Sequence, residues 1–203
     1  EEVPRVQVGL AGRLGNTIEG EPEQERMAAI QASMALLNEV MKACREDGVP
    51  PPPFARRTLA TLHVMLGREE DLQRAQELLE ENRDFIIEHE LVETFYYSTN
   101  QMALAHLYFK RGRLDDADSL YGKLQASAVR KLPDPNAYSR LNTAVLMRAD
   151  IASRKGRVDQ ALALLRSTYP SLAAQYPDDH RYVTGMQDAI RQLETTGRLR
   201  PQL

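Results

Sequence analysis

Several residue types are scarce in this chain of 203 residues, and the scarcity of cysteine excludes two kinds of stabilising site. Tryptophan is absent, and aromatic residues make up only 6% of the chain. Cys44 is the single cysteine, so neither an intrachain disulfide nor a cysteine-based zinc cluster can form. The position of Cys44 within a helical pattern predicts a small, buried apolar residue and not a reactive thiol.

Long hydrophobic runs and a strong charge excess are also missing. No apolar run approaches the ~18 residues of a membrane-spanning helix, so we expect no membrane partner. The first residues resemble neither a signal peptide nor a transit peptide, which makes the cytoplasm the expected location. Asp and Glu number 29 against 26 Lys and Arg, a net charge of −3. Nucleic-acid-binding proteins normally carry a basic excess, so we expect no nucleic-acid partner.

What the sequence does contain is dominated by residues that favour helices, chiefly Ala, Leu, Glu, Arg and Gln. Apolar residues recur at intervals of three and four, which is the period of an amphipathic helix. The pattern predicts an all-α protein with helices over residues 23–46, 54–66, 69–89, 92–111, 114–130, 136–155, 158–175 and 180–196.

Four similar turns divide the second part of the chain. Their glycines are Gly67, Gly112, Gly156 and Gly197, at successive intervals of 45, 44 and 41 residues. A glycine often follows a helix because one residue there adopts a positive φ, and we predict that conformation at all four. A repeat of this length holds two helices, so each unit is a helical hairpin that must stack on its neighbours.

These patterns predict three parts along the chain. Residues 1–22 are expected to be a flexible N-terminal arm, and residues 23–53 a helix followed by a proline-rich linker. Residues 54–203 are expected to form the repeat array, with the last helix as a cap.

One segment carries a family resemblance. Within residues 101–124, a large–small pair, an aromatic residue, a glycine turn, a small residue and a bulky residue follow one another, as Leu104, Ala105, Tyr108, Gly112, Ala117 and Tyr121. This order resembles the tetratricopeptide repeat (TPR) family, and the repeat length is similar to its longer variety, seen in kinesin light chains. The resemblance implies a right-handed superhelical stack of antiparallel hairpins, an α-solenoid, that binds proteins and is neither an enzyme nor a cofactor carrier.

The resemblance also implies where a partner binds. In this family the first helix of each hairpin lines a concave groove, and mapping by register gives Phe54, Arg57, Thr61, Met102, His106, Phe109, Lys110, Leu146, Asp150 and Arg154. The predicted partner-binding residues among them are Arg57, His106, Phe109, Lys110, Asp150 and Arg154. Alternatively, Asp150 and Arg154 simply form an i, i+4 ion pair. Thr61 stands where a chaperone-type carboxylate clamp needs Asn, which disfavours that ligand.

Other conspicuous residues receive structural interpretations. Asp134, directly before Pro135, is expected to cap the helix that follows it. Capping of a helix is also expected of Asp178, Asp179 and His180, and core packing of Phe95, Tyr96 and Tyr97. The run Glu69-Glu70-Asp71 is expected on a solvated helix face. His63, His89 and His106 fall in different helices without a zinc motif, so we expect no metal site and no catalytic residues.

The sequence leaves three functional classes open. The leading hypothesis is a scaffold that binds a peptide or protein in the groove, as part of a larger regulatory or sensor protein. The first alternative is an RNA-binding, pentatricopeptide-like array, which also consists of helical hairpins. The second alternative is an all-helical enzyme with an unrecognised site.

Overall fold

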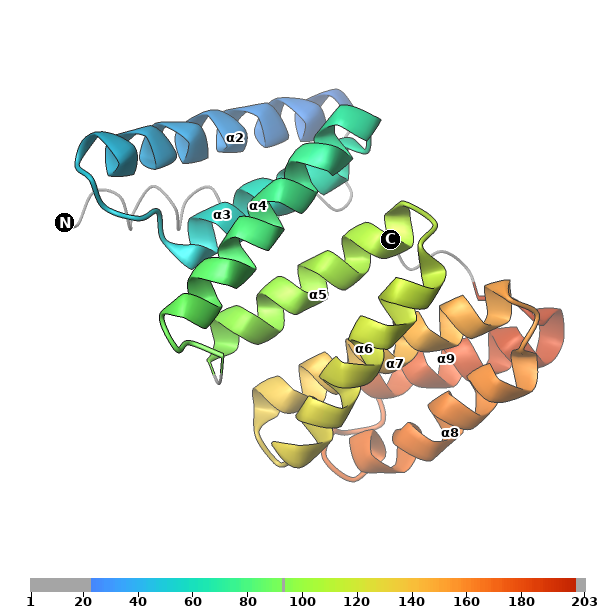
Figure 1. Ribbon diagram of the computed structural model, residues 1–203. Helices are drawn as coiled ribbons and strands as arrows, with labels where there is room; N and C mark the ends of the chain where they lie inside the picture. The colour runs from blue at the N-terminus through green and yellow to red at the C-terminus, as the bar shows by residue number, and fades with distance from the viewer. Residues whose placement is uncertain (1–22, 93, 200–203) are drawn as a thin grey trace. The chain divides into compact units, whose positions relative to one another are not determined.

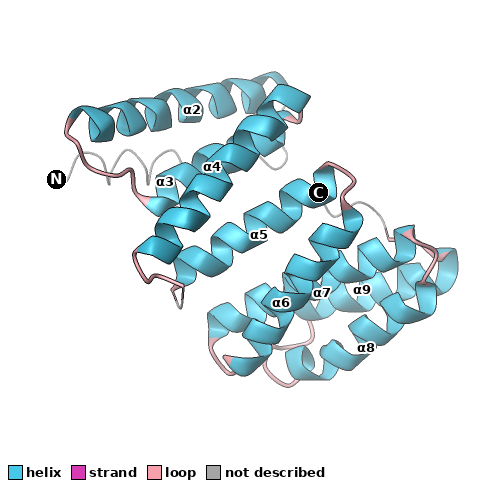
Figure 2. Cartoon of the chain, viewed as in Figure 1, coloured by secondary structure: helices cyan, strands magenta, loops and turns pink. Residues whose placement is uncertain are grey.

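The computed structural model describes residues 23–92 and 94–199 (Figure 1). The predicted N-terminal arm, residues 1–22, lies outside these described residues. All regular secondary structure in the described part is α-helical (Figure 2). The helices are α2 (Glu23–Glu46), α3 (Pro53–Leu66), α4 (Glu69–Glu88), α5 (Phe95–Lys110), α6 (Leu114–Arg130), α7 (Pro135–Arg154), α8 (Val158–Ala173) and α9 (Arg181–Thr196). The predicted all-α class is therefore confirmed.

The described helices fall into two compact units. Unit 1 lies within Glu1–Arg111 and contains α2–α5, whereas unit 2 is Gly112–Leu203 and contains α6–α9. In unit 1, α3 packs against α2, α4 and α5, and α4 also packs against α5. In unit 2, α7 packs against α6, α8 and α9, and α8 also packs against α9. Stacked helical hairpins are thus present within each unit. The three-part division predicted from the sequence stays a prediction.

The largest difference between predicted and observed helix bounds is at the start of α5. The sequence predicts a helix from residue 92, but α5 begins at Phe95. The reason is the way in which α4 ends: the amide of Leu91 donates to the carbonyl of Ile86 at 2.9 Å, and that of Glu90 to the carbonyl of Ile87 at 3.1 Å. This Schellman-type pattern reverses the chain, and the next helix starts only after it.

The four predicted glycine turns are confirmed. Gly67, Gly112, Gly156 and Gly197 have φ values between 67° and 73°. Among the described non-glycine residues, only Glu90 has a positive φ, at 56°. The turn at Gly156 has the same hydrogen-bond pattern as the turn at Glu90, because Arg157 donates to the carbonyl of Ala152 and Gly156 to that of Ser153. Glu90 therefore occupies a position that glycine normally fills.

This equivalence allows a matched test of backbone strain. We expect Gly156→Ala to lower the free energy of unfolding by up to about 1.5 kcal/mol. A residue with a Cβ is strained by about 1 to 2 kcal/mol at positive φ, and the roughly 0.5 to 1 kcal/mol of conformational entropy that alanine saves offsets part of this cost. A Cβ on Gly156 would meet nothing within 4 Å, so the cost comes from the backbone alone. Urea unfolding followed by circular dichroism measures the change.

The converse substitution, Glu90→Gly, is the control for this prediction. It relieves the same strain, but glycine loses about 0.5 to 1 kcal/mol more conformational entropy on folding. We expect Glu90→Gly to be at least as stable as the parent chain. Its gain in the free energy of unfolding should be no larger than the loss that Gly156→Ala causes. Equal stability of Gly156→Ala and the parent chain would contradict the strain argument.

Two equivalent ion pairs hold successive helices together. Arg111, which follows α5, binds Glu69 at the start of α4. Lys155, which follows α7, binds Asp115 in the first turn of α6, with Nζ and Oδ1 at 2.5 Å. In each pair, the basic residue beside a turn glycine reaches the acidic first turn of the preceding helix. The repeated contact gives these basic residues a role in stacking.

Two structural interpretations from the sequence are confirmed. Cys44 is buried. At the start of α7, the side chain of Asp134 caps the helix by accepting a hydrogen bond from the amide of Asn136 at 2.8 Å. At α9 the capping side chain is that of His180, whose Nδ1 accepts from the amide of Tyr182 at 3.2 Å. No cap bond to α9 comes from Asp178 or Asp179 among the described contacts.

Two other interpretations were wrong. Asp71 is not on a solvated face: it is only 5% exposed, because its carboxylate turns inward to contact His63 and Arg68. Phe95 and Tyr96 are not core residues, since they are 56% and 44% exposed. They occupy the first turn of α5, and burial on that helix begins at Asn100.

Candidate protein-interaction surface

The first element of the candidate site is the contact that places α5 against α3. The buried side chain of Asn82, on α4, donates to the carbonyl of Pro53 at 3.1 Å and to Oδ1 of Asn100, on α5, at 2.8 Å. Asn100 in turn donates to the carbonyl of Leu79 at 3.0 Å. Buried amides with specific partners fix the register of helices because an unpaired amide in the core is costly.

The predicted groove residues of unit 1 all lie at the surface of these two helices. We call the set the α3–α5 face. Its members are exposed or half-buried, and none is fully buried: Phe54, Arg57, Thr61, Met102, His106, Phe109 and Lys110. The core positions between them, such as Ala55, Leu59 and Leu104, are buried. The register derived from the sequence thus separates the surface of α3 and α5 from their core.

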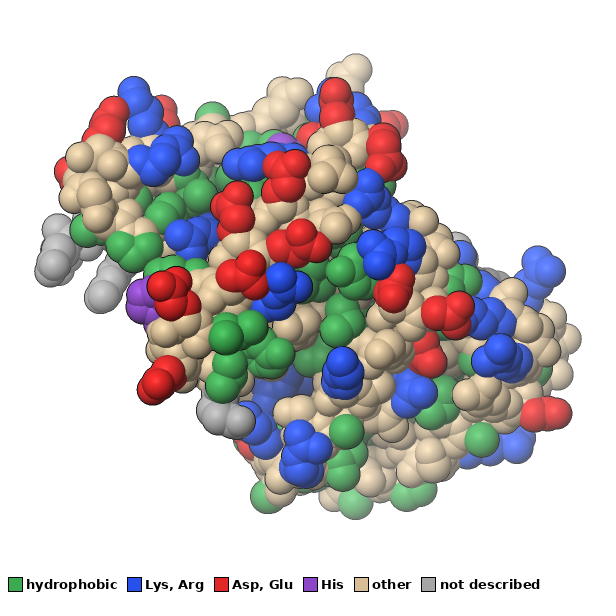
Figure 3. Space-filling view, in the orientation of Figure 1, with side chains coloured by type: hydrophobic (Ala, Val, Ile, Leu, Met, Phe, Trp, Pro, Cys, Tyr) green, Lys and Arg blue, Asp and Glu red, His purple; other side chains and the backbone are tan. Residues whose placement is uncertain are grey.

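Charge is distributed unequally among the helices of unit 1. Helices α3 and α5 contain three Lys and Arg residues, Arg56, Arg57 and Lys110, and no Asp or Glu. Helix α4 contains eight Asp and Glu residues and two arginines. The outer surface of α4 is correspondingly rich in acidic side chains (Figure 3). A partner that lies along α3 and α5 therefore contacts helices that carry Lys and Arg side chains but no Asp or Glu.

The two arginines on α3 form no ion pair or hydrogen bond with a carboxylate of the described residues. The guanidinium of Arg57 lies 5.0 Å from the ring centroid of Phe54, and burial lowers the pKa of Arg57. Arg56 is 9% exposed and lies 4.8 Å from the ring centroid of Phe85, and its Nη1 has no hydrogen-bond partner. Burial lowers the pKa of Arg56 too, against the opposing influence of Glu81 and Cys44. Partly desolvated cations of this kind gain from contact with an anion.

His106 is a polar but uncharged member of the face near neutral pH. Burial, together with the positive charge of Lys110 one turn later, lowers the pKa of His106 from 6.5 to about 4. The neutral imidazole offers one hydrogen-bond donor and one acceptor. Phe109 lies half-buried on the same helix, so α5 presents an aromatic ring, an imidazole and an ammonium group.

The remaining two predicted residues lie in unit 2. Nε of Arg154 donates to Oδ1 of Asp150 at 2.9 Å, so the alternative i, i+4 ion pair is formed. Asp150 is only 2% exposed, whereas the Arg154 side chain is 43% exposed. Asp150 therefore orients the guanidinium, and only Arg154 is exposed enough to reach a partner. Asp150 and Arg154 belong to unit 2, so they are treated as a set of their own, apart from the α3–α5 face of unit 1.

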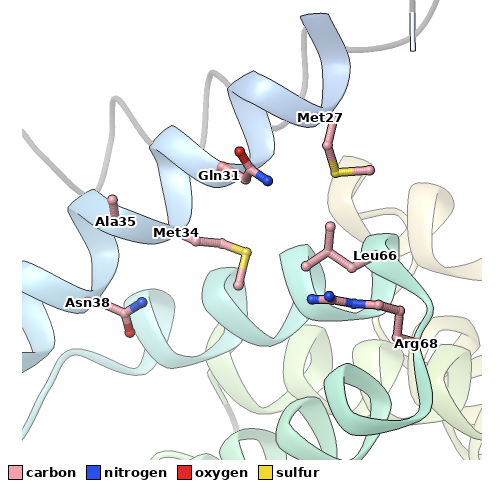
Figure 4. A pocket seen from close by; sticks show the side chains of 7 residues that line it. All are labelled: Met27, Gln31, Met34, Ala35, Asn38, Leu66 and Arg68. Carbon is pink, nitrogen blue, oxygen red and sulfur yellow. The ribbon is translucent and has the colours of Figure 1, made fainter. Parts of the chain in front are cut away.

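A cavity lies between α2 and the end of α3. The sequence did not predict it. Its volume is about 480 Å³, and Figure 4 shows the residues that line it: Met27, Gln31, Met34, Ala35, Asn38, Leu66 and Arg68. Met27 and Met34 belong to the apolar stripe that predicts α2, but a stripe alone does not distinguish a fully covered face from an open one.

Within residues 23–92 and 94–199, no group of three or more His, Cys, Asp and Glu side chains is arranged to hold a metal ion. None of the helices described is long and apolar enough to cross a lipid bilayer.

Comparison with known proteins agrees with this architecture. No family model matches the sequence, and no curated protein matches it. A solved structure described as a Podosopora anserina putative kinesin light chain with nearly identical TPR-like repeats superimposes with a TM-score of 0.72 at 21% sequence identity. The match covers 97% of this chain and 90% of that one. A single-substitution variant of the same protein gives the same TM-score and identity, covering 89% of its chain.

The chain therefore has the fold of the TPR-like helical repeat proteins. The resemblance noted in residues 101–124 is confirmed at the level of the fold, and 21% identity carries it no further. Repeat arrays of this kind generally serve as scaffolds for protein interactions and are typically non-catalytic.

Proposed function

We propose that this protein is a non-catalytic interaction module that binds an acidic segment of a partner protein along the α3–α5 face. The observation that carries the proposal is the charge pattern: α3 and α5 pack together and contain cations but no Asp or Glu. Arg57 and Lys110 would pair with carboxylates, and His106 and Phe109 would contact the peptide backbone and an apolar side chain. In unit 2, Arg154, oriented by Asp150, would be a separate contact for a partner.

The proposal fits the hypothesis of a peptide-binding scaffold within a larger regulatory or sensor protein. An RNA partner is not favoured, because the matching solved structures are TPR-like repeats and the chain as a whole is acidic. RNA binding remains testable, since contacts with phosphates weaken steeply with added salt. Titration with poly-anionic RNA at low and high salt therefore separates the two classes of partner.

Peptide selection tests the proposed function. Short random peptides displayed on phage are selected on the full chain and sequenced, and the enriched peptides are synthesised with a fluorescent label. We expect one class of the enriched peptides to be rich in Asp and Glu. For that class we expect Arg57→Glu with Lys110→Glu to weaken binding about tenfold or more, since a like charge replaces each favourable contact. Fluorescence anisotropy measures the affinity.

A matched charge reversal on another helix controls for net charge. Lys123 and Arg130 are exposed on α6 and lie outside the proposed site, so Lys123→Glu with Arg130→Glu should leave the affinity within about threefold. Circular dichroism checks that both variants keep their helical content. The lack of any acidic class among the selected peptides, or an equal loss of affinity for that class in both double variants, would contradict the proposal.

A further inference from the structure

Exposed apolar side chains concentrate at one turn of unit 1. Four large hydrophobic residues there are 41% to 56% exposed, more than half of all such exposed residues in the described part of the chain. We call them the turn patch: Ile87, Val92, Phe95 and Tyr96. Figure 3 shows apolar side chains gathered where α4 meets α5. Scattered exposed hydrophobics are common, but a contiguous group with two aromatic rings is typical of an interaction site.

Local structure explains why these side chains are on the surface. The Schellman-type turn ends α4 immediately after Ile87, and Val92 lies in the short connection that follows. Thr94, in extended conformation, is the N-cap residue of α5, so Phe95 and Tyr96 fall in its first turn. Later on α5, Leu104 and Leu107 are buried. The turn patch is thus held by two helix ends of defined geometry.

Carboxylates border the turn patch. Helix α4 carries eight acidic residues against two arginines, and acidic side chains follow it to its end in Figure 3. Glu88 and Glu90, on either side of the chain reversal, are exposed. Neither carboxylate forms an ion pair or hydrogen bond with another described residue, whereas Asp84, one turn earlier, pairs with Arg83 at 2.8 Å. The apolar centre and its unpaired acidic rim form one composite surface.

We propose that the turn patch docks a cationic segment of another protein that carries an aromatic or aliphatic side chain. The apolar side chain would pack against Phe95 and Tyr96, and Lys or Arg residues beside it would pair with Glu88 and Glu90. Charge complementarity determines this choice of occupant. The site is independent of the α3–α5 face, whose cations favour a partner of the opposite sign.

The same charges disfavour other occupants. An anionic lipid surface or an acidic peptide would be repelled by Glu88 and Glu90. A second copy of the chain, paired symmetrically through this patch, would bring the same carboxylates of both copies together. A basic partner is the occupant that both neutralises the rim and covers the aromatic rings.

A designed probe tests the proposal on the full chain. The probe is a fluorescein-labelled amphipathic peptide with Lys on one side and Leu on the other, and two matched peptides carry Glu for Lys or Ser for Leu. Fluorescence anisotropy is measured at low and high salt. We expect only the Lys/Leu peptide to bind measurably, with an affinity that falls as salt is added.

Variants then locate the binding site. Phe95→Ser with Tyr96→Ser should weaken binding of the Lys/Leu peptide about tenfold or more, and so should Glu88→Lys with Glu90→Lys. The controls are Val129→Ser, which removes an exposed apolar residue of unit 2, and Glu39→Lys, which reverses an exposed charge on α2. Both should bind like the parent chain. Circular dichroism confirms that each variant is folded.

Several outcomes would overturn the proposal. Parent-like affinity in the Phe95→Ser, Tyr96→Ser variant would place the peptide elsewhere. Equal binding of the Glu/Leu peptide would show that charge does not select the partner. A dimer in sedimentation that dissociates on the same double substitution would identify a second copy as the occupant.

Discussion

Replacement of Asp71 by alanine is expected to lower the free energy of unfolding by about 2 to 3 kcal/mol. Asp71 is 5% exposed, and its carboxylate accepts hydrogen bonds from Nδ1 of His63 at 2.8 Å and from Nε of Arg68 at 2.6 Å. Removal of the carboxylate leaves the half-buried imidazole without its partner at the α3–α4 junction. The cost lies below that of a fully buried pair because the Arg68 side chain is 65% exposed and regains water.

This contribution depends on pH in a defined direction. Burial acts to raise the pKa of Asp71, but the hydrogen bonds from Arg68 and His63, with their charges, outweigh it and lower that pKa. A lowered carboxyl pKa in the folded state stabilises the fold above the unfolded-state value of about 3.9, and the stabilisation is lost as the pH falls below it. The difference between the parent chain and Asp71→Ala should therefore shrink below about pH 4.

The pH dependence of the parent chain has a second source, which the Asp71 substitution should leave in place. The pKa of His106 falls to about 4 in the folded state, whereas an exposed histidine titrates near 6.5. The unfolded chain therefore binds the additional proton first, and stability declines as the pH falls from 6.5 towards 4. Both chains should show this decline in parallel, and only the acidic end should distinguish them.

Urea unfolding at several pH values, followed by circular dichroism, measures both effects. Glu70→Ala is the matched control, since Glu70 is the adjacent carboxylate and its side chain is 74% exposed. A substitution at such an exposed pair changes stability little. If Asp71→Ala and Glu70→Ala proved equally stable at neutral pH, the contacts of Asp71 with His63 and Arg68 would contribute nothing to the free energy of unfolding.

The elements predicted best from the sequence are those with a local cause. All eight predicted helices are present, and the four turn glycines adopt positive φ because a helix end requires it there. Asp134 caps α7 through a contact with an amide only two residues away. Signals of this kind need no knowledge of the tertiary fold.

Predictions that depend on distant neighbours were less accurate. Asp71 reads as one of three acidic residues at a helix start, but His63, eight residues earlier, turns it inward. Phe95 and Tyr96 read as core residues, yet no described neighbour buries them. The contact of Arg111 with Glu69 spans 42 residues and becomes visible only once helices α4 and α5 are adjacent.

In the candidate site, too, features with a local cause were predicted from the sequence, whereas features that depend on distant neighbours were not. The repeat register places Arg57, His106 and Lys110 at the surface of α3 and α5, where the structure has them. The same register selects Asp150, whose burial follows from packing in unit 2 that no spacing rule contains. The charge difference between α4 and its neighbours is readable in the sequence, but its meaning depends on which helices pack together.

The second large effect is expected in the core of unit 2. Ala149 of α7 and Ala161 of α8 are fully buried members of one apolar cluster, and these two helices pack against each other. We expect Ala161→Leu to lower the free energy of unfolding by roughly 1 to 3 kcal/mol, because a larger side chain in a filled core forces its neighbours off their preferred rotamers. Urea unfolding with circular dichroism measures the loss.

Ala163→Leu isolates the effect of packing from that of composition. Ala163 lies two residues further along α8 and is exposed, so the same substitution there adds the same atoms without a steric conflict. Alanine and leucine are both strong helix formers, so the helix itself is little affected in either variant. A large loss for Ala161→Leu beside a small change for Ala163→Leu would show that the small residue is required by the close approach of α7 and α8. Equal effects would mean that the space around Ala161 accommodates leucine, and the small residues of the repeat would then need a different explanation.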